Sequence, residues 1–425
     1  MDANKIREIR LIRENPRFRH YPEYKESGVE WIGEIPTHWN LAMLKYTARL
    51  VYGDTLVSEN RENGVVPVYG SNGIIDTHSS ANTLSPAIIV GRKGSLGKIQ
   101  YSDVPCFVID TAYYIDRRTS HVNLRWLHYI FQALKLERFR NSVLPGLNRE
   151  SAEGQYVPLI TAEEQTQIAK FLDRKTGQID ELIRVKERRI ELLQEQRTAL
   201  INQAVTKGLD PSVEMKPSGV EWIGEIPAHW EMRRNKRIFN ERDDRSATGE
   251  EELLTVSHIT GVSPRAEKKN VGMFLAETLE GYKHCSVGNL VINTMWAWMG
   301  ALGISTFDGI VSPSYNVYQL NSSEYLPKYY DYLYRTPNHV KEIIRWSKGI
   351  WNSRWRLYPD AFFSMSAIVP PFGEQKQIVD FLEHKNNQID DLIAAEQRKI
   401  ELLKEYRQSL ISEAVTGKID VRNEV

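Results

Sequence analysis

Residues 163–210 read "EEQTQIAKFLDRKTGQIDELIRVKERRIELLQEQRTALINQAVTKGLD", and residues 373–420 read "GEQKQIVDFLEHKNNQIDDLIAAEQRKIELLKEYRQSLISEAVTGKID". About half of the aligned positions are identical, and the alignment needs no gap. In both copies leucine and isoleucine recur at heptad spacing, which predicts two long helices that each carry an apolar seam. The seam comprises Leu172, Ile179, Ile183, Ile190, Leu193 and Leu200 in the first copy, and Leu382, Ile389, Ile393, Ile400, Leu403 and Leu410 in the second.

The ends and the interior of the two stretches carry further signals. Thr161 followed by Glu164 is typical of a capping box, and Gly208 is a stop signal for the first helix. The segments "KTG" at 175–177 and "KNN" at 385–387 predict an early interruption. We therefore expect a short helix in each copy, followed by one of about 30 residues that spans roughly 45 Å.

Charged residues interrupt the apolar seam at Lys186, Arg197, Glu396 and Arg407. Each helix could therefore be an ordinary surface helix on its own domain. Two matched helices of equal length can also bury their seams against each other. We favour this second arrangement, an antiparallel pair that serves as a strut between two domains.

A second repeat precedes each helix. The sequence "SGVEWIGEIP" occurs at Ser27–Pro36 and again at Ser218–Pro227, and the pairs His38-Trp39 and His229-Trp230 follow. The order of short motif, variable region and helix is thus written twice, which identifies the chain as a tandem duplication.

The regions between motif and helix have a mixed composition. Alternating strands are predicted at "AIIVGRK", "NLVINTM" and "SYNVYQL", and helices at "LRWLHYIFQALKLERF" and "LPKYYDYLYRTPNHVKEII". We predict an α+β chain with two globular mixed α/β domains, separated by the two long helices packed as an antiparallel coiled coil. The predicted boundaries are an N-terminal arm at 1–26, a first domain at 27–160, a first helical region at 161–210, a linker and second domain at 211–372, and a second helical region at 373–425.

Composition narrows the class of protein. The 425 residues are 41% hydrophobic and 26% charged, which is ordinary for a soluble globular chain. No apolar run reaches the roughly 18–20 residues that cross a bilayer, and the charged N-terminus lacks a signal core. The two cysteines, Cys106 and Cys285, show no metal-ligand spacing, so we expect a reducing, cytoplasmic location and no metal site.

Two segments resemble catalytic motifs, and neither fits. "GRKGSLGK" at Gly91–Lys98 is one residue too long for a phosphate-binding loop, and Ile99 stands where a magnesium ligand is needed. "VPPFGE" has Val369 at the position where an amino-methyltransferase loop needs a hydrogen-bond acceptor. We therefore expect no catalysis and no bound cofactor in this chain.

Local charge suggests nucleic acid as a partner although the formal net charge is zero. Residues 42–162 carry 13 Lys/Arg and 10 Asp/Glu, and residues 233–372 carry 17 and 14, so each region is about +3. Arginine and asparagine can read bases, while lysines mostly hold phosphates. The candidate DNA-contacting residues are Arg92, Lys93, Ser95, Arg265, Lys268, Lys269, Asn352, Arg354 and Arg356.

The duplicated segments, together with "GRKGSLG" and "GALGISTFDGIVSPSYNV", resemble the specificity (S) subunits of type I restriction–modification enzymes. The resemblance covers nearly the whole chain. It implies two target-recognition domains that each read one half of an asymmetric, bipartite DNA site. It also implies that two methyltransferase (M) subunits dock on the duplicated elements and that motor-nuclease (R) subunits join them. S-adenosylmethionine, ATP and magnesium would then belong to the partner subunits.

Four tryptophans of the repeated motif are candidates for docking partner subunits: Trp31, Trp39, Trp222 and Trp230. For Trp31 and Trp222, we favour local packing at the junction of domain and helix over direct contact with a methyltransferase subunit. Two alternatives to DNA reading remain open at this point. The chain could be a scaffold whose globular domains bind protein, or it could be a stand-alone nuclease.

Overall fold

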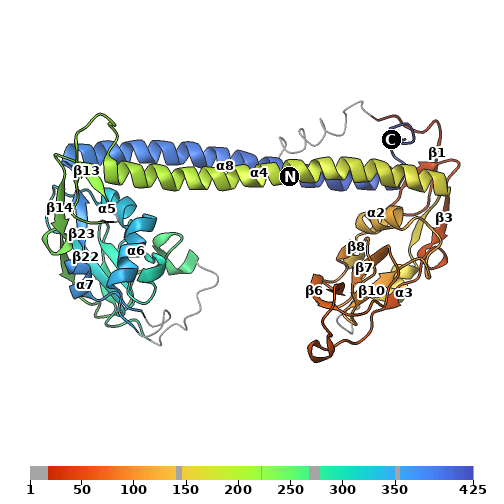
Figure 1. The fold of residues 1–425 in the computed structure, drawn as a ribbon, viewed down its shortest axis with the longest axis horizontal. Coiled ribbons are helices and arrows are strands. Elements are labelled where there is room, and N and C mark those ends of the chain that lie inside the picture. Colours follow the sequence, from red (N-terminus) through yellow and green to blue (C-terminus); the bar gives the residue numbers. More distant parts are fainter. Residues whose placement is uncertain (1–17, 140–145, 222, 268–277, 350–354, 425) are drawn as a thin grey trace. The chain divides into compact units, whose positions relative to one another are not determined.

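The computed structural model describes residues 18–139, 146–221, 223–267, 278–349 and 355–424 (Figure 1). The chain divides into two compact units. The first unit comprises Met1–Arg188 and Glu396–Val425, and the second comprises Arg189–Ala395. Each unit therefore contains a portion of both long helices. None of the described helices is apolar over a length that would cross a lipid bilayer.

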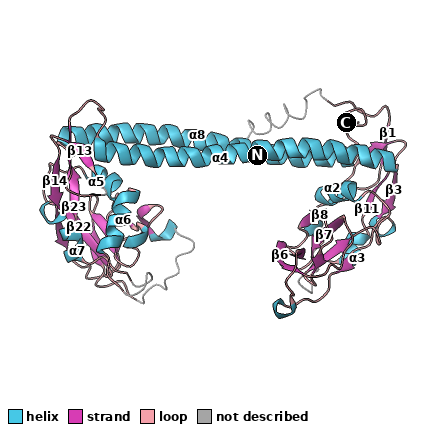
Figure 2. Ribbon diagram, viewed as in Figure 1, coloured by secondary structure: helices cyan, strands magenta, loops and turns pink. Residues whose placement is uncertain are grey.

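The first unit contains the following strands: β1 (Tyr24–Glu26), β2 (Glu34–Pro36), β3 (Asn40–Met43), β4 (Val51–Tyr52), β5 (Val66–Gly70), β6 (Gly73–His78), β7 (Ala87–Gly91), β8 (Ile99–Ser102), β9 (Phe107–Val108), β10 (Ala112–Ile115) and β11 (Tyr156–Leu159). Its own helices are α2 (Leu124–Leu134) and α3 (Arg149–Glu153), with short 3-10 turns η1 (Leu44–Tyr46), η2 (Ser58–Asn60) and η3 (Leu136–Arg138). The main sheet has the order β4-β10-β7-β8, and α2 packs on β7 and β8 (Figure 2).

The second unit contains these strands: β12 (Met215–Pro217), β13 (Glu225–Pro227), β14 (Glu231–Arg234), β15 (Phe239–Arg242), β16 (Leu254–Ser257), β17 (Gly261–Pro264), β18 (Lys283–Cys285), β19 (Leu290–Asn293), β20 (Leu302–Ile304), β21 (Gly309–Val311), β22 (Tyr315–Leu320) and β23 (Ser366–Val369). Its helices are α5 (Pro327–Tyr334), α6 (Pro337–Trp346) and α7 (Pro359–Ser364), with 3-10 turns η4 (Asn235–Arg237), η5 (Arg265–Glu267) and η6 (Ala297–Met299). The main sheet has the order β15-β22-β19-β20, and α5 packs on β20.

The two main sheets share one topology. In the first sheet, β7 pairs with β8, which follows it after a loop, and with the later strand β10. In the second sheet, β19 pairs in the same way with β20 and with the later strand β22, and all these pairs are antiparallel. The predicted strands are confirmed as β7, β19 and β22. The helix predicted at 326–344 is divided into α5 and α6, because Pro337 begins a new helix that the Thr336 hydroxyl caps.

The two long helices are continuous. Helix α4 (Ala162–Lys207) has 46 residues and α8 (Phe372–Val415) has 44, so the predicted interruptions at 175–177 and 385–387 are wrong. The Thr176 hydroxyl donates to the carbonyl oxygen of Leu172 one turn earlier, at 2.7 Å, and therefore does not compete with the helix. A glycine such as Gly177 costs a helix only about 1 kcal/mol, which the packing of α4 offsets.

Within each unit the segments of α4 and α8 run antiparallel. In the first unit Arg407 pairs with Asp180 at 2.9 Å and Lys186 pairs with Glu396 at 3.0 Å. In the second unit Arg197 pairs with Asp390. Higher residue numbers on one helix thus face lower numbers on the other, and every seam residue is buried or half-buried. The predicted antiparallel packing is confirmed, and the charged residues on the seam form ion pairs between the helices.

Candidate nucleic-acid interface

A short loop at residues 92–98 joins β7 and β8 in the first unit and holds three predicted DNA-contacting residues. The Lys93 side chain is about half exposed and lies 3.9 Å from the Asp110 carboxylate. Ser95 is half-buried, and its carbonyl oxygen accepts from the backbone nitrogen of Lys98. The Nζ of Lys98 donates to both oxygens of Asn72, at 2.8 and 2.9 Å, so the loop is tied to the β5–β6 turn.

Arg92 is held by aromatic rings. Its guanidinium carbon lies 4.8 Å from the ring centre of Tyr52 and 5.9 Å from that of Tyr113, and Nη1 donates to the carbonyl oxygen of Asp110 at 3.0 Å. Arg149 approaches the same Tyr52 ring at 5.2 Å. Burial is the main cause that raises the pKa of the Tyr113 hydroxyl to about 12. The arrangement fixes two cations beside a partly exposed tyrosine, which suits phosphate and base contacts.

Sequence reasoning missed Tyr52 and Arg149. They come from segments about 40 residues before and 50 residues after the loop, and a linear pattern gives no sign that they meet it. The one local signal is that Asn148 is a helix cap, which makes Arg149 the first residue of α3.

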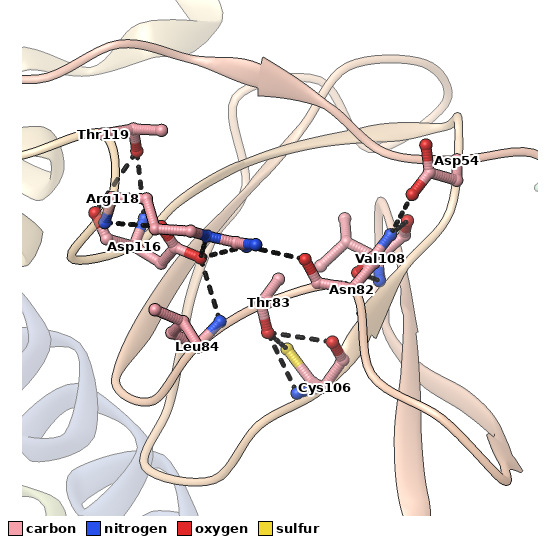
Figure 3. Close-up of polar contacts among 9 residues, drawn as sticks. All are labelled: Asp54, Asn82, Thr83, Leu84, Cys106, Val108, Asp116, Arg118 and Thr119. Atoms are coloured by element: carbon pink, nitrogen blue, oxygen red, sulfur yellow. Dashed lines mark hydrogen bonds and ion pairs between the residues drawn. The ribbon is translucent and has the colours of Figure 1, made fainter.

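A buried acid braces the neighbouring segment 82–84 (Figure 3). Asp116 is fully buried and accepts from the Nε of Arg118 and from the backbone nitrogen of Leu84, both at 2.9 Å. Burial alone would raise the pKa of this carboxyl, but these hydrogen bonds outweigh it and leave the pKa below its usual value. Asn82 donates to Asp54, and the hydroxyl of Thr83 donates to the carbonyl oxygen of Cys106 at 2.8 Å. These contacts join segment 82–84 to Asp116, Asp54 and Cys106.

In the second unit the equivalent loop, residues 294–301 between β19 and β20, has different chemistry. It reads "TMWAWMGA" and carries no charge. The rings of Trp296 and Trp298 lie 6.3 Å apart at 16°, and Trp355 meets Trp298 edge-on at 6.1 Å. Trp296 is 50% exposed. This loop was not among the predicted DNA-contacting sites, because its aromatic residues resemble core residues in a linear pattern.

The remaining predicted residues of the second unit lie on separate segments. Arg265 begins η5 and is half-buried, and its charge lies close to the Tyr315 hydroxyl. The half-buried Arg356 follows Trp355 and donates to its carbonyl oxygen at 2.9 Å. The predicted Lys268, Lys269, Asn352 and Arg354 fall outside the described residues, as does Trp222.

The repeated motif serves the junction of each domain with its long helix. Trp39 donates from Nε1 to Glu164 at 3.1 Å, and Trp230 donates in the same way to Glu374 at 2.9 Å. Both indoles are fully buried in this chain, so neither offers a surface to a docking partner. Trp31 is half-exposed, and its Nε1 donates to the carbonyl oxygen of Tyr156 at 3.2 Å. Of the described tryptophans in the docking prediction, only Trp31 keeps exposed surface.

A family model described as "Type I restriction modification DNA specificity domain" matches residues 47–193. The putative type I restriction enzyme MjaX specificity subunit of Methanocaldococcus jannaschii is 22% identical to this chain. The alignment covers 94% of this chain and 98% of that relative. Residues 47–193 therefore match a type I DNA specificity domain, and nearly the whole chain is similar to a type I specificity subunit.

Two further proteins are similar to this chain. The type I restriction enzyme MjaVIII specificity subunit of the same organism is 30% identical over 118 residues, which is 26% of each chain, so the match spans about a quarter of that relative. A solved chain, described under "complex assembly" and "conformational transition of the type I R-M system", has a TM-score of 0.61 at 13% identity. It covers 92% of this chain and 99% of that one. This second likeness concerns the fold alone.

Proposed function

We propose that this chain is a type I specificity subunit and a non-catalytic reader of a bipartite, asymmetric DNA site, in which each globular domain reads one half. The long helices set the distance between the two readers. The duplicated junctions seat two methyltransferase subunits, and restriction subunits join the complex for cleavage. S-adenosylmethionine, ATP and magnesium are assigned to those partners.

The observation that carries the proposal is one sheet topology bearing two different loops. The order β4-β10-β7-β8 recurs as β15-β22-β19-β20, yet the loop after β7 is basic and the loop after β19 is aromatic. A scaffold kept constant under loops of different chemistry is what two readers of different half-sites require. The match of residues 47–193 to a DNA specificity domain supports DNA as the molecule that is read.

The duplicated junctions support the docking of two equal partners. Residues that are identical in the two copies form the same contacts in both units: tryptophan to helix glutamate, and helix glutamine to the start of a domain helix. Two identical partner subunits need two equivalent binding surfaces, and tandem copies of one junction would supply them.

Methylation mapping tests the proposal directly. The chain is co-expressed with the methyltransferase subunit encoded beside it, and methylated adenines are mapped across the host genome. We expect one interrupted sequence with two unlike halves. A protein-binding scaffold would yield no methylated motif that depends on this chain, and a stand-alone nuclease would cut DNA when the pure chain is incubated with magnesium.

Exchange of one domain tests the independence of the readers. Residues 42–160 are replaced by the matching segment of a specificity subunit with a different known target. We expect one half of the mapped site to change and the other half to stay. A change in both halves would refute independent reading.

Shortening the helices tests their role as a spacer. Deleting one facing heptad from each of α4 and α8 keeps the seam in register and removes about 10 Å of helix, or about three base pairs of B-DNA. We expect unchanged half-site sequences separated by a shorter gap. An unchanged gap would contradict the spacer role.

A further inference from the structure

The loop at 294–301 is the place in the second unit where the first unit carries its basic loop. Both loops follow the third strand of the shared sheet order and precede the fourth. Arg92, Lys93 and Lys98 in the first loop are replaced by a stretch without charge in the second. If both loops face DNA, the second must contact it through something other than cations.

Trp296 is a half-exposed ring that lies beside a second, nearly parallel indole. Trp298 lies nearly parallel to it at 6.3 Å and is itself fixed, because its Nε1 donates to the carbonyl oxygen of Met295 at 3.1 Å and Trp355 packs edge-on against it. Trp296 remains 50% exposed. A planar group can therefore stack on the indole without disturbing the core beneath it.

The backbone holds this ring in place. The backbone nitrogen of Trp296 donates to the carbonyl oxygen of Asn293 at 3.0 Å. The carbonyl oxygen of Trp296 accepts from the backbone nitrogens of Met299 and Ala301 at 2.9 and 3.2 Å. Gly300 closes the turn at φ +84°, against Val340 of α6. Because the loop is ordered before any ligand arrives, little conformational entropy is lost when the indole is used.

Two cationic residues lie next to Trp355, the ring that packs against Trp298. Lys348 is exposed and exchanges two backbone hydrogen bonds of 2.9 Å with Arg356, which directly follows Trp355. A stacking ring with lysine and arginine beside it is the combination that binds a base together with the adjacent phosphates.

We propose that Trp296 contacts the second half-site by stacking on a base that is partly unstacked from its neighbour. This inference rests on the proposed function and adds a mode of reading: the first domain uses cations at this loop, and the second uses an indole. Such a wedge favours base steps that unstack easily, such as TA or CA/TG, so it contributes specificity without a hydrogen bond to the base.

The test uses the complex of this chain with the methyltransferase subunit encoded beside it, and a library of random-sequence DNA duplexes. Wild type is compared with Trp296→Ala, Trp296→Phe and the control Tyr358→Ala, which removes an exposed aromatic ring at the start of α7 in the same unit. Each complex is used to select DNA, and its affinity for the duplex preferred by wild type is then measured. Thermal unfolding of each variant checks that the fold is intact.

We expect Trp296→Ala to weaken binding of the preferred duplex about 5- to 100-fold and to relax the selected sequence in one half-site only. Trp296→Phe keeps a stacking face and should stay within about threefold of wild type, as should Tyr358→Ala. The inference is overturned if wild type selects two half-sites and Trp296→Ala selects the same two with equal affinity. It is also overturned if both alanine variants weaken binding equally. If wild type selects no bipartite sequence, the proposed function itself fails and the inference fails with it.

Discussion

At the scale of single residues, the duplicated motif is explained by contacts that recur in both units. The helix glutamate accepts from a tryptophan in each unit, and a histidine lies beside it: His38 is 3.5 Å from Glu164, and His229 is 2.7 Å from Glu374. The copies differ in burial. The side chain of Glu164 is 6% exposed and also accepts from the Tyr21 hydroxyl, whereas that of Glu374 is 36% exposed.

This difference in burial gives a matched pair of mutations. Glu164→Ala leaves two buried donors, the Trp39 indole and the Tyr21 hydroxyl, without an acceptor, and should lower the free energy of unfolding by about 2–4 kcal/mol. Because Glu374 itself is 36% exposed, Glu374→Ala lets water take the place of the carboxylate beside the Trp230 indole and should cost about 1 kcal/mol. Urea denaturation of both variants measures the difference, and an equal or reversed ranking would contradict it.

Buried histidines predict how stability depends on pH. Burial is the main cause that lowers the pKa of His128 to about 3, so the folded chain holds this ring neutral. The unfolded chain binds a proton below its ordinary pKa of about 6.5. Stability therefore falls as the pH drops below about 6.5, by at most about 1.4 kcal/mol per pH unit from this group.

The variant His128→Leu tests the pH dependence. Between pH 7 and 5.5 its free energy of unfolding should change less with pH than that of wild type, even if its stability at pH 7 is lower. His121→Leu, at an exposed position of the same domain, serves as the control. Identical slopes for wild type and His128→Leu would show that His128 does not carry the effect.

At the scale of elements, the long helices were the easiest part of the fold to predict and also the source of one error. The heptad pattern predicted their packing, and every seam residue is at least half-buried. The interruption predicted at 175–177 rested on the local cost of threonine and glycine. That cost is small, and the hydroxyl of Thr176 bonds within the helix and to Tyr129 of α2, a partner that no local pattern reveals.

The charged residues on the seam specify which helices pair. Lys186 and Glu396 occupy the same position in the two copies, 210 residues apart, and they face each other at 3.0 Å. The hydrogen bonds from Lys186 and Lys399 lower the pKa of the Glu396 carboxyl. Two identical copies of either helix would place like charges at this point, so the pair favours α4 against α8.

Charge exchange tests this pairing. Glu396→Lys places two lysines opposite each other and should destabilise the chain by about 3 kcal/mol, since it breaks a largely buried pair. The double variant Lys186→Glu, Glu396→Lys restores opposite charges and should recover most of that loss. Lys404→Ala, which breaks the exposed pair with Glu401, is the control and should cost under about 1 kcal/mol. A double variant no more stable than Glu396→Lys, measured by urea denaturation, would contradict the assignment.

The candidate site was less predictable than the elements. The basic residues of the first loop could be named from their sequence, since cations among glycines indicate an exposed loop. Tyr52 and Arg149 could not, because only tertiary packing brings them to Arg92. The docking role given to Trp39 and Trp230 overlooked Glu164 and Glu374, whose carboxylates turn both indoles inward.

At the scale of the whole molecule, the two ends of the described chain belong to one unit. Asp420 donates from its backbone nitrogen to the carbonyl oxygen of Arg19 at 2.7 Å, and Lys418 donates from Nζ to that of Glu34. Gly417 lies against Pro36 and Trp39, as Gly208 lies against Trp230 in the second unit. Both units therefore use a helix end to close over the repeated motif.

Gly417→Ala tests this closure. The residue has φ +73°, and a Cβ would lie 2.5 Å from Pro36 and 2.8 Å from Trp39, so the substitution should destabilise the first unit by about 2–4 kcal/mol. Gly177→Ala is the control, because open space surrounds that position on α4 and the change should stabilise the helix slightly. Hydrogen exchange resolved along the sequence should be faster than in wild type in the first unit of Gly417→Ala. The second unit should exchange at the wild-type rate. Uniform exchange throughout the chain would refute a local effect.

The first unit is built from two segments that lie far apart in the sequence, and this has a consequence for synthesis on the ribosome. Residues 18–188 emerge early, but they cannot complete their fold until the segment from Glu396 onward has been translated. A nonsense codon shortly before position 396 would thus leave the first unit without its last segment, while nearly all of the second unit, residues 189–395, would be translated.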